Sequence, residues 1–357
     1  MLVKLNILRL FYILLLCFSS GLLSGQDLQF SQYYSAPLQL NPALTGGFGA
    51  KYRVSAIYRD QWRAPLDKSI ASFGAALDLR FEINSGAFSG DAAGVGLQFI
   101  TDQASPVDLS TNMIAVSGGF HKSLARNQRK YISAGAQIIT GQRNILYENL
   151  VFQDQFDGVS SFSGATGEDL PSNNFGFSDL AVGLNFVNAV TTNTQYFVGA
   201  SLQHVLEPQV SFYKKDTDES QHDKSDSPLK RKYTLHAGST LRSSDNLRIS
   251  PRLLFVNQGE SMRALVGSVF IIEPNHTDAF NFHMGAWLAG VRDFEGGPKL
   301  DDLGALIGLG IGELFIGMSY DLNLRDVVKY TSGQGAFELS ISYWGNYEDE
   351  GGACPTF

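Results

Sequence analysis

The stretch "SIASFGAALDLRF", residues 69–81, alternates between apolar and polar positions. One set of alternate positions is apolar throughout: Ala71, Phe73, Ala75, Leu77, Leu79 and Phe81. The other set holds Ser72, Gly74, Asp78 and Arg80, so every charge lies on one side. Successive side chains of a strand point to opposite faces, and this period of two therefore predicts a strand between an apolar phase and a wet one.

The same alternation recurs along the chain, most clearly in "FNFHMGAWL" (280–288) and "FELSISYWG" (337–345). A scan for it predicts fourteen strands, an even number, as single-chain bacterial outer-membrane barrels have. The predicted strands are 52–62, 69–82, 92–103, 109–124, 129–141, 177–190, 195–206, 231–243, 246–257, 261–273, 278–291, 301–311, 313–324 and 335–345.

The lengths of the predicted connections orient this barrel. If the chain starts in the periplasm, the odd-numbered connections face outward, and they include the two longest, 142–176 and 207–230. Most even-numbered ones are tight, for example "TTNT" and "SSDN". Outer-membrane barrels combine short periplasmic turns with longer extracellular loops. We therefore predict an all-β, up-and-down antiparallel barrel in the outer membrane of a Gram-negative bacterium.

Composition supports one large barrel over two ordinary domains. The chain of 357 residues has 37 glycines, 11 prolines, 25 phenylalanines and 14 tyrosines. Charged residues make up 17%, below the roughly 25% of typical soluble domains. The net charge of −8 argues against nucleic acid as a partner.

The N-terminus predicts a secretory signal peptide over residues 1–25. Lys4 and Arg9 precede a short apolar run that is followed by small residues, and cleavage is expected near Gly25 or Gln26. The mature chain then keeps one cysteine, Cys354, and cannot form an internal disulfide. The predicted organisation is an N-terminal segment at 26–50, the barrel at 51–346 and a periplasmic tail at 347–357.

The sequence lacks a recognisable catalytic pattern. It contains no G-x-S-x-G, no H-E-x-x-H and no phosphate-binding glycine loop. Its six histidines show no metal-ligand spacing, so we expect no enzyme activity, cofactor or metal. His236 and His283 fall on polar strand faces, where we expect hydrogen-bonded residues of the lumen.

Charges of both signs are also predicted to face the lumen. Opposite charges inside a barrel usually pair and fill it, which favours a plugged lumen. A porin could use the same charges for ion selectivity, so an open pore remains an alternative. The residues are Arg53, Arg59, Asp78, Arg80, Asp321 and Glu338.

Several segments together resemble one known family. They are "DLQFSQYYSAPLQLNPALTGG" (27–47), "YRVSAIYRDQW" (52–62), "FSDLAVGLNF" (177–186), "YFVGASLQHVLEP" (196–208) and "LFIGMSYDLN" (314–323). In this order they closely resemble the PorP/SprF outer-membrane proteins of the type IX secretion and gliding-motility machinery.

The resemblance implies a non-enzymatic barrel of fourteen strands. Its implied role is to help secreted surface proteins, typically adhesins with a type IX C-terminal domain, to reach or stay on the cell surface. Further implied contacts are outer-membrane lipid and lipopolysaccharide, and periplasmic or lipoprotein components of the machinery. A small-molecule channel and a structural envelope anchor are the alternative functions.

The segment behind the signal peptide is predicted to close the periplasmic side of the lumen. Tyr33 and Tyr34 would pack against lumen residues, and Asn41-Pro42 would force a turn before the first strand. Gly46 would let the chain bend into the barrel wall. The alternative is a flexible periplasmic tail.

The two long loops are the predicted partner-binding surfaces. Aromatic residues at loop tips offer large contact areas for a protein partner. We expect loop 142–176 to pack over the barrel mouth, and the alternative is that it forms a partner-binding surface. For both loops, a further alternative is that the aromatic side chains fold inward and do not contact a partner. The candidate residues are Tyr147, Phe152, Phe156, Phe212 and Tyr213.

Overall fold

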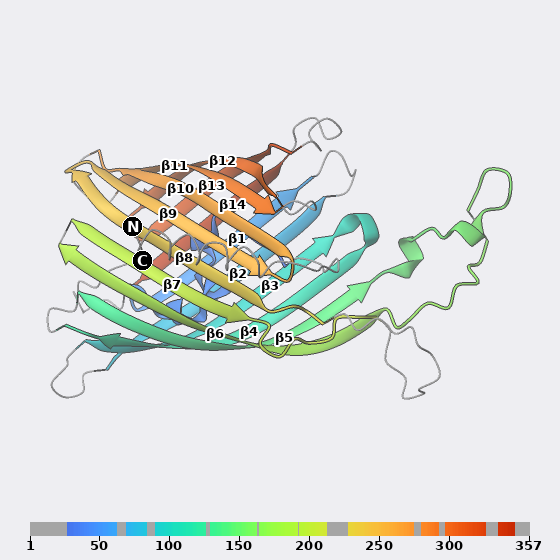
Figure 1. Cartoon of the computed structure of the whole chain (residues 1–357), viewed down its shortest axis with the longest axis horizontal. Helices are drawn as coiled ribbons and strands as arrows, with labels where there is room; N and C mark the ends of the chain where they lie inside the picture. Colours follow the sequence, from blue (N-terminus) through green and yellow to red (C-terminus); the bar gives the residue numbers. More distant parts are fainter. Residues whose placement is uncertain are drawn as a thin grey trace, which may run out of the picture.

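The computed structural model describes residues 27–62, 69–83, 90–125, 129–162, 164–191, 193–212, 228–274, 280–292, 297–325 and 335–346. In it the chain forms a closed barrel of fourteen antiparallel strands (Figure 1). Every strand pairs with its sequence neighbours, and β1 pairs with β14 to close the cylinder. The predicted fold class and strand number are confirmed.

Strand bounds agree with the prediction to within a few residues. The strands are β1 (Tyr52–Gln61), β2 (Ile70–Ile83), β3 (Asp91–Ala104), β4 (Leu109–Ser123), β5 (Lys130–Ile145), β6 (Asn174–Thr191), β7 (Thr194–Gln203), β8 (Lys232–Ser244), β9 (Leu247–Gln258), β10 (Ser261–Ile272), β11 (Phe280–Arg292), β12 (Pro298–Ile311), β13 (Leu314–Asn323) and β14 (Ala336–Gly345). The largest difference is at β5 and β6, which continue pairing as far as Asn144 opposite Asn174. Residues 142–144 are all polar and 174–176 read Asn-Phe-Gly, so alternation carries no clear signal there.

The two faces of the wall have opposite chemistry. In β2, Leu77 and Phe81 are exposed on the outside, whereas Ser72, Asp78 and Arg80 are buried inside. An apolar exterior around a polar interior is the pattern of a transmembrane barrel. Among the described residues, no helix is long and apolar enough to cross a bilayer.

The two ends of the barrel differ in their connections. At one end, β6 to β7, β8 to β9 and β12 to β13 are joined by two residues each. At the other end, β5 to β6 are joined by residues 146–173 and β7 to β8 by residues 204–231. We call these the short-turn end and the long-loop end. By the rule for outer-membrane barrels they face the periplasm and the exterior, respectively.

Residues 27–50 lie inside the barrel as a series of short helical turns. These are η1 (Tyr33–Ser35), α2 (Pro37–Leu40) and η2 (Pro42–Leu44), and Leu38 and Ala43 are fully buried. We call residues 27–50 the lumenal segment. The sequence predicted that this segment lies at the periplasmic side only, but in the structure it extends along the lumen. It runs from Asp27, beside Gln258 at the long-loop end, to Phe48, beside Arg53 near the short-turn end. The reason is that its polar partners are distributed along the whole height of the wall.

The connection between β5 and β6 projects away from the barrel (Figure 1). This connection contains two short helical turns, η4 (Tyr147–Asn149) and η5 (Gln153–Gln155). A third turn, η3 (Ser105–Val107), lies between β3 and β4. The expectation that this loop packs over the barrel mouth is wrong. Its order comes from its own hydrogen bonds, many of them accepted by Asp154 and Asp157, and Phe156 contacts Phe162.

Four features of the sequence analysis fall outside the described residues. They are the signal peptide (1–25), Tyr213, Cys354 and the tail at 347–357.

Candidate functional site

Charged pairs of the barrel wall hold the lumenal segment in place. One of these pairs is formed by Arg53 and Asp78. The register of β1 and β2 places Arg53 directly opposite Asp78. The guanidinium donates two hydrogen bonds to the carboxylate, from Nε at 2.9 Å and from Nη2 at 2.7 Å. The backbone N–H of Gly46 donates to the same carboxylate at 2.8 Å, and Arg80 donates to the Gly46 carbonyl at 2.9 Å. A bidentate pair of this kind fixes geometry as well as charge.

A second charged group crosses the closing seam between β1 and β14. Arg59 lies opposite Glu338 in the register and forms ion pairs with both Glu338 and Asp321. The carboxylate of Glu338 accepts the backbone N–H groups of Ser31 and Gln32, each at 2.8 Å. All three charged side chains are buried. Since burying a charge is costly unless it is paired and hydrogen-bonded, the lumenal segment completes this group.

Asn41 anchors the middle of the segment. Its amide nitrogen donates to the backbone carbonyls of Leu184 at 3.0 Å and Ala200 at 3.2 Å, and it lies 3.1 Å from His236 Nε2. Its side-chain oxygen accepts the N–H of Ala43 at 2.9 Å, which starts η2. Asn41 therefore ties β6 and β7 to the turn that Pro42 begins.

Wall glycines make room for this turn. A Cβ on Gly94, Gly119 or Gly135 would lie within 3.0 Å of backbone atoms of the lumenal segment. The segment thus packs directly on the backbone of β3, β4 and β5. Gly46 itself has φ +71°, a conformation that favours glycine.

A latch of charged residues holds the start of the segment at the long-loop end. His204 lies 2.5 Å from both Asp27 and Asp179, and Lys232 lies 3.5 Å from Asp27. Burial alone would lower the pKa of His204, but hydrogen bonds to Asp179 and Asp27 outweigh it and raise the pKa to about 9. Burial would raise the pKa of Asp27, yet Lys232 and His204 hold it well below its usual range. We call Asp27, Asp179, His204 and Lys232 the latch.

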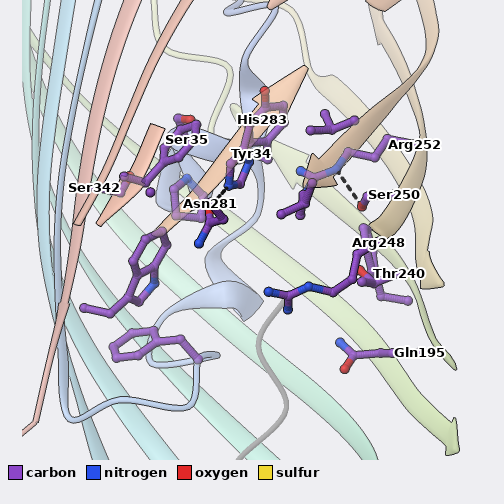
Figure 2. Close-up of a pocket in the computed structure, with 18 of the residues that line it drawn as sticks. Tyr34, Ser35, Gln195, Thr240, Arg248, Ser250, Arg252, Asn281, His283 and Ser342 are labelled. Atoms are coloured by element: carbon purple, nitrogen blue, oxygen red, sulfur yellow. Dashed lines mark hydrogen bonds between the residues drawn. The ribbon is translucent and has the colours of Figure 1, made fainter. Parts of the chain in front are cut away.

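A cavity of about 820 Å³ opens on the opposite, short-turn end of the lumen (Figure 2). It reaches the turn residues Asn193 and Gly312 and is bounded inside by Tyr33 and Tyr34 of the lumenal segment. We call this cavity the vestibule. His283 lines it and lies 2.6 Å from Asn281.

The projecting loop, residues 146–173, has its own internal order, and we call it the lobe. Asp157 accepts the backbone N–H groups of Val159, Ser160 and Ser161 and the hydroxyl of Ser161. The Ser161 hydroxyl and these N–H groups hold the pKa of Asp157 well below its usual range. The rings of Phe156 and Phe162 lie 5.0 Å apart. The lobe therefore presents a turn of defined shape.

The predicted site residues fall into three groups. The plug candidates Tyr33, Tyr34, Asn41, Pro42 and Gly46 lie in the lumenal segment, and the lumen candidates line its surroundings. Phe156 is exposed on the lobe, whereas Tyr147 and Phe152 are half-buried there. Phe212 packs edge-on against Phe175 at 5.0 Å, at the start of β6.

Sequence reasoning missed the latch and every arginine of the vestibule except Arg53. Asp27 and His204 are 177 positions apart, and no local pattern connects them. Arg248 and Arg252 carried a signal that was available, because both occupy the same face of β9 at a spacing of four. Within the part of the chain that the structure describes, no group of three or more His, Cys, Asp or Glu residues could hold a metal ion.

An apolar exterior, a polar interior and a closed antiparallel sheet define an outer-membrane β-barrel. The family described as type IX secretion system membrane protein PorP/SprF matches residues 22–343. This chain therefore belongs to the PorP/SprF family. No curated protein matches it.

Several solved outer-membrane barrels are similar to this chain at low sequence identity. A mutant of the TodX monoaromatic hydrocarbon channel aligns with 87% of this chain and 94% of its own, at 12% identity and a TM-score of 0.51. The CymD monoaromatic hydrocarbon channel covers 92% and 96%, at 11% identity and a TM-score of 0.49. The toluene transporter TbuX of Ralstonia pickettii covers 88% and 94%, at 12% identity and a TM-score of 0.47. The likeness to the TodX mutant concerns the fold alone.

Proposed function

We propose that this barrel assists the export or cell-surface anchoring of a secreted, adhesin-like protein that carries a type IX C-terminal domain. Membership of a type IX secretion membrane family carries the proposal. The barrel acts without catalysis, as a docking platform in the outer membrane. Its other contacts are outer-membrane lipid, lipopolysaccharide and components of the secretion machinery.

The lobe is the proposed docking surface for the secreted protein. It extends from the end of the barrel that we assign to the exterior, and its apolar side chains are exposed: Phe156 by 46%, Phe162 by 50% and Val159 by 83%. The Asp157 turn holds them in a fixed arrangement, which reduces the conformational entropy lost on binding. Exposed aromatic side chains on such a turn are typical anchors of protein interfaces.

In this proposal the secreted protein does not pass through this lumen. The lumenal segment is buried in the barrel and is hydrogen-bonded to β1, β2, β4, β6, β7, β8, β9, β10, β13 and β14. Moving it would expose several buried charges. Those contacts support a closed barrel that positions its partner, and they do not favour the small-molecule channel.

The test is an affinity pull-down of the tagged barrel from detergent-solubilised outer membranes, with mass spectrometry of the bound proteins. We expect recovery of a large protein that carries a type IX C-terminal domain. The double variant Phe156→Ser/Val159→Ser should reduce that recovery at least tenfold, because interface anchors often contribute about 2 kcal/mol or more each.

Val107→Ser is the matched control, since Val107 is an exposed apolar residue of the β3–β4 connection at the same end of the barrel. It should leave recovery unchanged. Recovery of only lipid and lipopolysaccharide would contradict the proposal and favour a channel. Equal recovery with all three proteins would reject the lobe as the docking surface.

A further inference from the structure

The vestibule has a one-sided charge. Its lining contains five arginines and two histidines, and none of the described residues that line it is Asp or Glu. The arginines are Arg53, Arg129, Arg242, Arg248 and Arg252. A cleft lined by one sign of charge concentrates ligands of the opposite sign.

Some of this charge is already balanced from behind the cavity wall. Arg53 is paired with Asp78, and Arg242 and Arg248 are both paired with the buried Glu273. Arg252 differs, because no carboxylate of the described residues forms an ion pair with it. Its guanidinium stacks on the ring of Tyr34 at 4.1 Å and donates to the Ser250 hydroxyl at 3.3 Å.

Two other polar atoms of the lining have no hydrogen-bond partner among the described residues. The hydroxyl of Tyr34 and Nδ1 of His236 are buried and make no hydrogen bond within the described residues. His236 is only 2% exposed. Buried polar atoms are normally hydrogen-bonded, so these atoms mark a place where a ligand can supply the missing partner.

We propose that the vestibule binds an acidic peptide segment presented from the periplasm. This inference goes beyond the proposed function, since it concerns the opposite end of the barrel and a different partner. The arginines supply charged hydrogen bonds, while Tyr34, Phe48, Phe197, Phe315 and Trp344 supply apolar contact for the rest of the segment.

The spacing of Arg248 and Arg252 favours an extended peptide over a single small anion. Arg248 is paired with Glu273 but is still partly exposed, and its guanidinium has five N–H donors, so it can bind a second carboxylate. Arg248, Ser250 and Arg252 alternate along β9 and all line the vestibule (Figure 2). Four strand positions span about 13 Å, which one carboxylate cannot bridge. Two acidic side chains four positions apart on an extended peptide have the same spacing. The cavity volume of about 820 Å³ lies within the range of about 300–1,000 Å³ typical of ligand pockets.

The experiment measures fluorescence anisotropy of a short dye-labelled peptide with the full-length barrel in detergent. The probe carries two glutamates four positions apart, and a second probe replaces both with glutamines. We expect only the acidic probe to bind, and added NaCl should weaken it because salt screens partly exposed charges. Arg252→Gln should weaken binding about tenfold, equivalent to about 1.4 kcal/mol.

Lys130→Gln is the matched control, because Lys130 is an exposed cation at the same end of the barrel that does not line the vestibule. Heat-modifiable migration on gels verifies that each variant is folded. Equal binding of both probes, or equal weakening by both substitutions, would overturn the proposal. Full displacement of the probe by acetate at matched carboxylate concentration would also overturn it, and would leave a site for small anions only. None of these results depends on whether the lobe binds a secreted protein.

Discussion

At the scale of single residues, the lumen is built by pairs that face one another across strands. Asp78 and Glu338 each accept backbone N–H groups of the lumenal segment and an arginine from β1. Neither carboxylate is satisfied by the barrel wall alone. The segment is therefore part of the folded interior, and single atoms of the wall decide whether it fits.

Neighbouring glycines of β4 offer a direct test of this fit. A Cβ on Gly119 would lie 2.5 Å from the Thr45 carbonyl, whereas a Cβ on Gly118 would meet only the Gly94 carbonyl at 4.0 Å. We expect Gly119→Ala to lower the free energy of unfolding by about 1–3 kcal/mol, as overpacking usually does. Urea unfolding followed by gel migration measures it, and Gly118→Ala is the control. The same loss in both variants would contradict close packing of the segment on β4.

The sequence predicts which face of the barrel wall a side chain occupies, but it does not predict which residues that side chain contacts. Alternation assigns Asp78 and Arg80 to one face of the predicted strand, and the structure places both inside the barrel. Which groups they contact is decided by the closure of the barrel. Arg59 meets Asp321 across 262 positions, and no local spacing encodes that distance.

At the scale of elements, the latch joins the start of the lumenal segment to β6, β7 and β8. His204 lies between two carboxylates, so its contribution depends on its positive charge. Asp27 lies between His204 and Lys232, so its contribution depends on its negative charge. The latch is closed only where both are ionised.

The pKa shifts define the pH window of the latch. The pKa of His204 is raised from 6.5 to about 9, so its stabilisation is complete below pH 6.5 and is lost as pH rises through about 9. The pKa of Asp27 is lowered from 3.8, so its stabilisation is present above pH 3.8 and is lost at more acidic pH. We expect the hydrogen-exchange protection factors of residues 28–32, which correct for the intrinsic rise of exchange with pH, to fall above pH 9. His204→Gln should remove that step, and a step that persists in this variant would assign it to another group.

Strands were predictable because each one carries its own alternation. β13 and β14 were predicted to within one residue at each end. The lobe was not predictable in the same way. Its sequence is rich in apolar residues, which suggested burial against the barrel, but Phe156, Val159 and Phe162 stay exposed on a turn that Asp157 holds by hydrogen bonds.

At the scale of the whole molecule, the barrel has an occupied middle and two different ends. The long-loop end carries the latch and the lobe, and the short-turn end carries the arginine-lined vestibule. We propose that the lumenal segment closes the path between them. Its burial and its hydrogen bonds to ten of the strands support this proposal.

Removal of residues 27–45 tests the closed path. In planar bilayers the intact barrel should show little conductance, and the deletion variant should show stable openings, because the segment would no longer fill the lumen. Gel migration must show that the variant is a folded barrel. Unchanged conductance in a folded deletion variant would contradict a closing role for the segment.

The seam between β1 and β14 also has a consequence for the order of assembly. Arg59 and Glu338 meet across it, and Ser31 and Gln32 bind the same carboxylate from inside. Ser31 and Gln32 must therefore wait for β14, the last strand, before these bonds can form. Contacts of such sequence separation slow folding, because the entropy of loop closure opposes them until late. We expect the growing sheet to curl around its own N-terminus, which acts as a template for the final strand pairing.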